Sequence, residues 1–428
     1  MKSFWKQTRA ALRDHGPTCK EIKGYGPPSE DDIEPKIPGD RLLPNLIDDY
    51  EDSEFAKLKA AHTGFLKAAR SIAPKLPYVA KSRGVVMSGG GKYFGHSLTS
   101  ITLMRKAGCD LPVELFINDH DDYDTKMCDE ILPSLNAECV VMTDILGTDK
   151  VEKYQYKVLS ILFSSFQELL FLDADAWPVR DISPVFDNEP FLSTGLIVWP
   201  DFWHPTVWPG FYDLIDQPVT NFTGRRSSES GMILYNKAIH ADSLLLATYY
   251  NWYGPNYFYN MFSQGAPGEG DKETFRQAAI ALSKPYWDVR SPNKVMGRWF
   301  NGTFESYGIK QMDPIADYKL AEFKRGGGVL EKNSKGEEIW APPLFVHHNL
   351  WKMDLLKIPT MDDPMLRKDP KGRQMRLWDV DHDLIERTGF DVEDFMWKTI
   401  IDNNCYESFR KECAALRTYY RNVFEKEP

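Results

Sequence analysis

Residues 168–179 read ELLFLDADAWPV, an apolar run that leads into two aspartates, Asp173 and Asp175, and then into a turn at a proline. Side chains alternate across a strand, so we expect both carboxylates on one side and Ala174 on the other. Burying two like charges without compensation costs several kcal/mol per ion. Aspartate oxygens suit a hard divalent cation such as Mg²⁺ or Mn²⁺, which usually binds one or two carboxylates together with substrate phosphates. Most aspartate pairs of this spacing are solvated turns or caps, but the buried strand before this pair favours a metal site.

The segments around this stretch repeat the order strand, loop, helix. We expect strands in GVVM (84–87), PVELFIND (112–119), AECVVMTD (137–144) and ELLFLDAD (168–175), and helices over 95–109, ended by Gly108, and 149–166. This alternation predicts an α/β domain with a mostly parallel central sheet. Ligands in such sheets bind at the carboxyl ends of the strands. The residues that close the strands are therefore candidates for a site: Ser88, Asn118, Asp119, Asp144, Asp173 and Asp175.

The remaining segments are less regular. We expect strands at 191–199, 230–236 and 342–348, and helices at 237–253 and 271–283. Residues 24–40 are acidic and proline-rich, which indicates an extended linker, and an amphipathic helix over 53–73 follows with Ser53 as its N-cap. We predict three units: an N-terminal stem or helical wrap (1–80), a catalytic domain (81–360) and a C-terminal accessory segment of charged helices (361–428).

Composition excludes several classes of protein. The 428 residues are 42% hydrophobic and 27% charged, as in ordinary globular proteins, and a net charge of −10 argues against a nucleic-acid partner. No run reaches the ~18–20 apolar residues that span a bilayer, and the N-terminus lacks the apolar centre of a signal peptide. Two glycosylation sequons, at Asn221 and Asn301, fit a lumenal protein whose anchor is absent from the chain.

The six cysteines have no CxxC spacing, so a zinc site is not expected. Their even number permits disulfides in an oxidising compartment, where Cys405 and Cys413 are the easiest local pair. Six buried free thiols fit the same sequence.

The ordered motifs resemble one enzyme family. KVLSILFSSFQELLFLDADAWPV (157–179) resembles the helix–strand–DxD segment of retaining glycosyltransferases with the GT-A fold. GVVMSGGGKYFGHSLTSITLMRKAGCDLPVELFI, LNAECVVMTDIL, GLIVWPDFW and FVHHNLWK are similar to fungal mannosyltransferases of glycosyltransferase family 71. The resemblance covers roughly residues 83–352, and as an ordered set these motifs are highly specific.

This resemblance implies a GT-A nucleotide-sugar-binding fold, Mn²⁺ with Mg²⁺ as the alternative, and a GDP-mannose donor. It implies transfer to an α-mannoside or mannan acceptor with retention of configuration, with an α-1,2 linkage favoured and an α-1,3 linkage as the alternative. It also implies a type II membrane protein of the Golgi lumen and a place in a Golgi glycosyltransferase complex. The chain departs from the family pattern because no anchor helix is recognised in it.

The metal and donor candidates follow from motif and resemblance together. His347 and His348 end the late strand; alternation lets one of them face the ion, and the resemblance selects His347 to complete the coordination by Asp173 and Asp175. The SGGGK loop fails the Walker A spacing, but its glycines allow close approach to a nucleotide; the alternative is a tight turn with a solvated lysine. Lys157 and Lys352 are candidates for the diphosphate, and Lys157 is otherwise a surface lysine. The donor-binding candidates are Ser88, Gly89, Gly90, Lys92, Lys157, Asp173 and Lys352.

The catalytic candidates are carboxylates. By resemblance, Glu229 stabilises an oxocarbenium-like centre or acts as a nucleophile, much as carboxylates do in glycosidases. Asp271 resembles the aspartate that binds donor-sugar hydroxyls, although a carboxylate at the start of a helix is also a good N-cap. Asp175 acts through the ion. In the two aromatic-rich stretches (199–213 and 248–262), we expect most rings in the core, with Trp203 and Trp252 lining an acceptor groove.

Two other functions remain compatible with the sequence. The same fold could use another sugar nucleotide, such as UDP-galactose or UDP-GlcNAc, or the chain could be a non-catalytic mannan-binding or assembly subunit. A dinucleotide oxidoreductase is disfavoured because SGGGKYFG does not fit GxGxxG.

Overall fold

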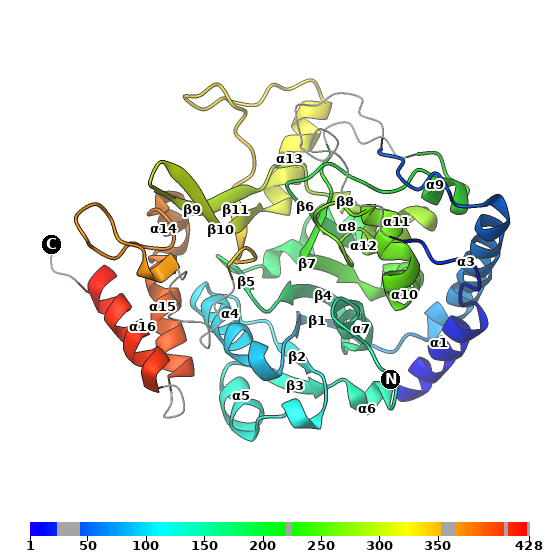
Figure 1. Cartoon of the computed structure of the whole chain (residues 1–428), viewed down its shortest axis with the longest axis horizontal. Coiled ribbons are helices and arrows are strands. Elements are labelled where there is room, and N and C mark those ends of the chain that lie inside the picture. Colours follow the sequence, from blue (N-terminus) through cyan, green and yellow to red (C-terminus); the bar gives the residue numbers. More distant parts are fainter. Residues whose placement is uncertain (24–42, 220–224, 352–363, 406–409, 426–428) are drawn as a thin grey trace.

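The centre of the protein is a seven-stranded sheet, seen in a computed structural model that describes residues 1–23, 43–219, 225–351, 364–405 and 410–425 (Figure 1). Its order is β3 (Ala137–Val141), β2 (Val113–Ile117), β1 (Val79–Ser88), β4 (Phe166–Asp173), β7 (Ser228–Asn236), β6 (Leu196–Pro200) and β8 (Trp287–Asp288). β7 runs antiparallel to its two neighbours, and the other neighbouring pairs are parallel. The predicted α/β class with a mostly parallel sheet is therefore confirmed.

Side chains that alternate along these strands pack into two hydrophobic cores, one on each face of the sheet. Val86 and Phe171 pack into the first core with α7 (Gln155–Phe163) and α10 (Lys237–Trp252). Met87 and Leu172 pack into the second with α4 (Phe94–Lys106). Both faces are covered, which explains why the strands read as nearly continuous apolar runs. Burial of both faces leaves the strand ends as the place for polar chemistry.

A second, antiparallel sheet contains β5 (Ala176–Pro178), β11 (Pro343–His347), β10 (Thr303–Met312) and β9 (Lys294–Phe300). β5 follows the two aspartates, and its Ala176 lies opposite His347 of β11. The predicted strand at 342–348 is confirmed, whereas the hairpin of β9 and β10 was not predicted. This small sheet joins the late histidines to the DxD segment.

Local expectations differ from the structure in several segments, of which three bear on the argument. Residues 191–194 form the short helix α8 (Phe191–Thr194) before β6, because Gly195 adopts φ 66° and breaks the expected strand. The helix expected over 53–73 is α3 (Asp52–Ile72), and Glu51, not Ser53, lies at its N-cap, without a side-chain capping bond. β4 ends at Asp173, so Ala174 and Asp175 form a turn and do not continue the strand.

The N-terminal segment packs as a wrap on the first core. α1 (Lys2–Asp14) and α3 lie along one side of the molecule (Figure 1). Trp5 is buried against Phe163 and Trp252, with ring centroids 5.4 and 5.5 Å away, and its indole donates a hydrogen bond to Asp149. The predicted linker at 24–40 lies outside the described residues.

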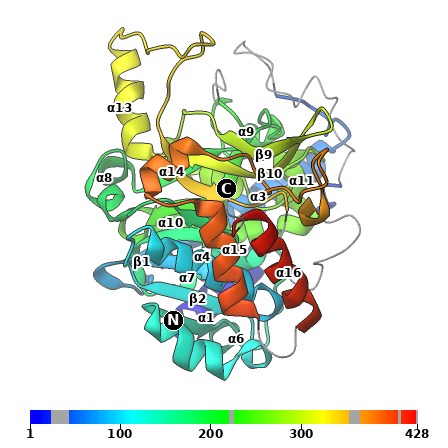
Figure 2. The ribbon, with the colours of Figure 1, turned by 90° about the vertical axis from the view of Figure 1, so that its left-hand side faces the viewer.

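The C-terminal segment forms helices, as predicted: α14 (His382–Thr388), α15 (Val392–Asn404) and α16 (Arg410–Val423). α15 packs beside α4, where the Asn403 amide donates a hydrogen bond to Thr102 Oγ1 (Figure 2). These helices form a third core with the small sheet.

Four cysteines form disulfides in the structure. The expected local pair, Cys405–Cys413, is bonded, and Cys128–Cys139 is a second bond that was not predicted. Cys19 and Cys109 are buried free thiols. Asn301 of the second sequon lies at the exposed turn between β9 and β10, while Asn221 lies outside the described residues. Within the described ranges, no helix has the length and apolarity required to cross a bilayer.

Candidate active site

A cavity of about 1270 Å³ lies at the carboxyl ends of β1, β2 and β4. Strand register puts these ends at one level, because Ser88 pairs with Phe116 on one side and with Asp173 on the other. The loop 265–272 and His347 close the opposite wall. The cavity therefore lies where ligands bind in open α/β sheets.

Asp173, Asp175 and His347 converge in this cavity. One ligand atom from each lies within 4.8 Å of the others. His347 Nε2 is 3.2 Å from Asp175 Oδ1 and 3.8 Å from Asp173 Oδ2. The predicted reason for this convergence was wrong in part, because Asp175 lies in a turn and is not oriented by strand alternation. Two carboxylates and one imidazole nitrogen form a donor set that fits Mn²⁺ or Mg²⁺.

The orientation of His347 depends on a close contact with β7. A Cβ atom on Gly231 would lie 2.3 Å from Cε1 of the imidazole, so the ring occupies the space that a side chain would fill. His348 lies elsewhere: its Nδ1 contacts the Trp351 carbonyl at 2.8 Å, and its ring stacks on Trp177. The geometry therefore agrees with the choice of His347 over His348.

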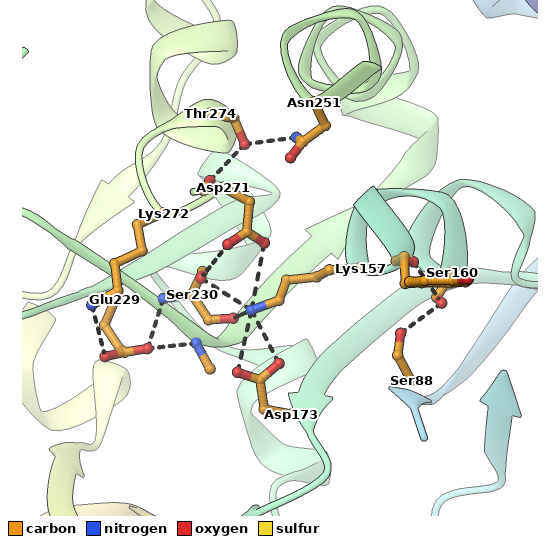
Figure 3. Close-up of polar contacts among 12 residues, drawn as sticks. Ser88, Lys157, Ser160, Asp173, Glu229, Ser230, Asn251, Asp271, Lys272 and Thr274 are labelled. Atoms are coloured by element: carbon orange, nitrogen blue, oxygen red, sulfur yellow. Dashed lines mark hydrogen bonds and ion pairs between the residues drawn. The ribbon is translucent and has the colours of Figure 1, made fainter. Parts of the chain in front are cut away.

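Lys157 lies buried between two carboxylates (Figure 3). Its Nζ is 3.0 Å from Asp173 Oδ1 and 3.5 Å from Asp271 Oδ2, and it donates to the Ser230 carbonyl at 2.5 Å. Burial alone would lower the pKa of Lys157, but Asp173 and Asp271 outweigh it and raise the pKa above its ordinary value. The interpretation as a surface lysine is therefore wrong, and Lys157 ties the DxD segment to Asp271.

Asp271 faces the cavity and does not cap a helix. α12 begins at Thr274 with Glu273 at its N-cap, so the capping interpretation is wrong. Asp271 Oδ1 accepts a hydrogen bond from Ser230 Oγ at 3.1 Å, while Asp271 Oδ2 accepts none. Burial raises the pKa of Asp271; Lys157 opposes this shift, and the charge of Asp173 adds to it.

Glu229 is a buried carboxylate with one oxygen held by the backbone. Its Oε1 accepts hydrogen bonds from the N–H groups of Ser230 and Gly231 at 2.9 and 2.8 Å, whereas its Oε2 accepts none (Figure 3). Burial alone would raise its pKa, but Lys272, His347 and the Gly231 N–H lower the pKa to about 2. Glu229 is therefore ionised throughout the neutral range.

Lys272 is a site residue that the sequence interpretation missed. Its Nζ pairs with Asp201 and lies 3.9 Å from Glu229 Oε2, and its side chain lines the cavity. Burial alone would lower the pKa of Lys272, but Glu229 and Asp201 raise it. The only signal in the sequence was its position next to Asp271.

The glycine loop forms another wall of the cavity. A Cβ on Gly89 would lie 2.2 Å from Ser97 Oγ, and Gly91 adopts φ 52°, so the loop is a tight turn that requires its glycines. Ser88 Oγ lies 2.7 Å from Ser160 Oγ, and the exposed Lys92 ammonium lies 5.1 Å from the centre of the Tyr93 ring. Residues 88–93 all line the cavity. This position is compatible with a loop that approaches a nucleotide and also with a tight turn that carries a solvated lysine.

Several predicted site residues are not placed in the cavity, among them Asp119 and Asp144, which closed predicted strands and do not line it. Trp252 is half-buried against Trp5 of α1 and does not line this cavity, so its role in an acceptor groove stays a prediction. Trp203 is half-buried too and does not line this cavity, because its segment folds toward Ser227. Lys352 lies outside the described residues.

Comparison with known proteins adds independent findings. The family model described as "Mannosyltransferase putative" matches residues 82–315. The chain is 40% identical over 312 residues to alpha-1,2-mannosyltransferase MNN24 of Candida albicans. This alignment covers 63% of this chain and 44% of that protein. The chain is 34% identical over 415 residues to MNN21 of the same organism (81% and 61%) and 35% identical over 305 residues to MNN2 of Saccharomyces cerevisiae (62% and 51%). The chain thus spans about half the length of these curated relatives.

Similar solved structures are distant. The galactosyltransferase LgtC, in complex with donor and acceptor sugar analogs, is 11% identical with a TM-score of 0.38, over 77% of this chain and 99% of that chain. The glycosyltransferase GlyE of Streptococcus pneumoniae is 14% identical with a TM-score of 0.37, over 74% and 62%.

Proposed function

The chain belongs to the mannosyltransferase family whose model spans residues 82–315, and from this premise we propose that it is a metal-dependent, retaining GT-A enzyme that transfers mannose from GDP-mannose to an α-mannoside. The observation that carries the proposal is the convergence of Asp173, Asp175 and His347 in one large cavity. The α-1,2 linkage is inferred from the printed names of the relatives, which are alpha-1,2-mannosyltransferases.

The three converging residues are the proposed ligands of Mn²⁺ or Mg²⁺. The ion would supply Lewis-acid stabilisation of the departing nucleoside diphosphate. The protein's own part is to hold these ligands in place: Lys157 fixes Asp173 through an ion pair at 3.0 Å, and Gly231 leaves the space that the His347 ring occupies. Lys92, exposed at the cavity wall, is the proposed contact to phosphate.

The buried carboxylates are assigned to the sugar. Asp271, held by Ser230 and Lys157, is placed to accept hydrogen bonds from donor-sugar hydroxyls. Glu229 presents Oε2, which accepts no hydrogen bond, as a permanent negative charge. A carboxylate with so low a pKa is a weak base and a weak nucleophile, because both properties follow basicity. This favours stabilisation of an oxocarbenium-like centre by Glu229 and same-face attack by the acceptor hydroxyl.

The test is a transfer assay with GDP-mannose and a short α-mannoside, in Mn²⁺ and with a chelator, followed by NMR of the product linkage. We expect an α-1,2-linked product that the chelator abolishes, and at least ~100-fold less product from Asp175→Ala, because one ligand of the ion is lost. Full activity of Asp175→Ala in Mn²⁺ would contradict the site. Transfer from UDP-galactose or UDP-GlcNAc alone would favour the second donor class, and binding without any transfer would favour a non-catalytic subunit.

We further propose that the protein works in the Golgi lumen, where it contacts mannan and a glycosyltransferase complex. The two disulfides support an oxidising compartment, and the exposed Asn301 sequon supports passage through the secretory pathway. Endoglycosidase treatment of the protein from its native host tests this proposal: an unglycosylated protein with reduced thiols would contradict it.

A further inference from the structure

The cavity extends well beyond the proposed metal site. Asn118 and Asp122, just after β2, line it together with Asp173 at the end of β4. β2 and β4 are separated by β1 in the sheet order. Two strand spacings of ~4.8 Å put these ends ~10 Å apart, which is the reach of a ribose and a base from a diphosphate. The end of β2 is therefore where a donor nucleotide bound at the metal site would place its base.

Two tyrosines shape this end of the cavity. Tyr156 donates a hydrogen bond from its hydroxyl to Asn118 Oδ1 at 2.7 Å, which fixes the amide. Tyr93 has an exposed fraction of 46% and lines the wall, with the Lys92 ammonium 5.1 Å from the centre of its ring. The backbone of Gly89 and Gly90 also lines the cavity. The space suits a flat heterocycle that stacks on an aromatic ring.

Three carboxylates, Asp119, Asp121 and Asp122, follow the end of β2, and Asp122 is the one that lines the cavity. Asp119 is satisfied internally: its Oδ1 accepts from the backbone N–H groups of Asp121 and Asp122, and its Oδ2 from the Asn118 amide. Burial of the Asp122 carboxylate and the nearby charge of Asp119 raise the pKa of Asp122. Its side chain is half-buried in the cavity wall, and a Cβ on Gly91 would lie 2.7 Å from its Oδ1. Asp122 is thus a fixed acceptor beside the glycine loop.

We propose that the Asp122 carboxylate reads the guanine base of the donor by accepting hydrogen bonds from its N1–H and exocyclic amino group. This inference rests on the proposed function and deepens it by naming the residue that selects the nucleotide. Guanine presents these two donors side by side, which matches the two oxygens of one carboxylate. Uracil presents one N–H between two carbonyl oxygens, so the second carboxylate oxygen would face an acceptor. Asp122 therefore favours GDP and disfavours UDP.

The test compares the binding of GDP, IDP and UDP by calorimetry in Mn²⁺, because inosine differs from guanosine only by the missing amino group. We expect the unmodified protein to bind GDP ~10-fold or more tightly than IDP. Asp122→Asn should bind GDP ~10- to 100-fold more weakly and lose most of the preference over IDP, while IDP binding reports that the variant is folded. Asp121→Asn, at an exposed neighbour outside the cavity wall, is the matched control and should keep the preference.

The outcomes separate the two proposals. If Asp122→Asn binds GDP and keeps the ratio of GDP to IDP affinity seen in the unmodified protein, the role of Asp122 is overturned. The mannosyltransferase proposal then still stands. A protein that binds UDP but not GDP would overturn the GDP-mannose donor itself, and the reading of guanine with it.

Discussion

The position of the His347 imidazole depends on the absence of a side chain at Gly231. The nearest ring atoms lie 2.3 and 2.4 Å from where a Cβ would stand, a separation that real Cβ atoms do not tolerate. The histidine is buried on β11, and its Nε2 lies 3.2 Å from Asp175 Oδ1 at the wall of the cavity. A single glycine thus decides whether the third proposed metal ligand reaches Asp175.

We therefore expect Gly231→Ala to weaken Mn²⁺ binding by about 10-fold or more, because residues that orient a metal ligand contribute on this scale. Calorimetric titration with Mn²⁺ measures the effect. Gly326→Ala is the control, since a Cβ there meets its neighbours at ordinary distances of 3.5 Å or more and its φ is negative. Equal Mn²⁺ affinities in both variants would mean that His347 does not bind the ion.

The Lys157 ammonium compensates the charges of two carboxylates, the half-buried Asp173 and the buried Asp271. Removal of the ammonium group in Lys157→Met leaves these like charges together without compensation, and we expect the free energy of unfolding to fall by about 3 kcal/mol. Urea denaturation measures it, and Lys67→Met, on the exposed face of α3, should change stability by less than ~0.5 kcal/mol. A loss for Lys157→Met no larger than for Lys67→Met would mean that solvent already compensates the carboxylates.

At the scale of elements, buried polar groups hold the helices at the sheet. Lys237, at the start of α10, donates hydrogen bonds to the carbonyls of Leu162 and Ser164 at the end of α7. α7 carries Lys157 at its other end, so this contact links the packing of two helices to the site. Burial lowers the pKa of Lys237 to about 7, although the charge of Glu114 opposes this shift.

The pKa of Lys237 predicts a pH dependence of stability. Between pH 7 and its ordinary pKa of 10.5, the unfolded chain binds this proton and the folded protein does not. Stability therefore rises with pH in that window as far as this residue contributes. We expect Lys237→Met to remove this contribution, so that the stability difference between variant and unmodified protein changes from pH 7 to pH 9.5. Parallel urea curves at the two pH values measure it; a constant difference would mean an unshifted lysine.

At the scale of the whole molecule, the N-terminal wrap and the central sheet share one hydrophobic core. Trp5 and Leu12 of α1 belong to the same buried cluster as Val86 and Phe171 of the sheet. The expected boundary near residue 80, between the N-terminal wrap and the catalytic domain, therefore does not separate two hydrophobic cores. The wrap supports α7 and α10, which in turn position the walls of the cavity.

We expect Trp5→Ala to lower the free energy of unfolding of the whole protein by about 3–5 kcal/mol, because a large buried ring is lost from a shared core. Arg13→Ala, whose side chain is 76% exposed, should be nearly neutral. Thermal unfolding should show one shifted transition in Trp5→Ala. A separate early transition, with the main one unchanged, would mean that the wrap folds independently.

Much of the central sheet could be predicted because each of its main strands has a recognisable local sequence pattern. Apolar runs that end in Ser88, Asn118 or Asp173 indicate both the strand and the edge at which it ends. The helix at 191–194 and the hairpin of β9 and β10 were missed because short segments of mixed polarity lack a distinct period. Lys272 was missed because its partners, Asp201 and Glu229, are distant in sequence.

By itself, the sequence determined the α/β class, the segments that form the parallel strands and the edge that carries the chemistry, because these follow from local periodicity and from the residues that close each strand. Only the tertiary structure decided which groups meet there. His347 reaches Asp175 across 172 residues through the pairing of β11 with β5, and Lys157 lies between Asp173 and Asp271. Trp252 packs against Trp5, away from the cavity. Such contacts depend on how distant segments share buried volume and compensate charge, which no local pattern encodes.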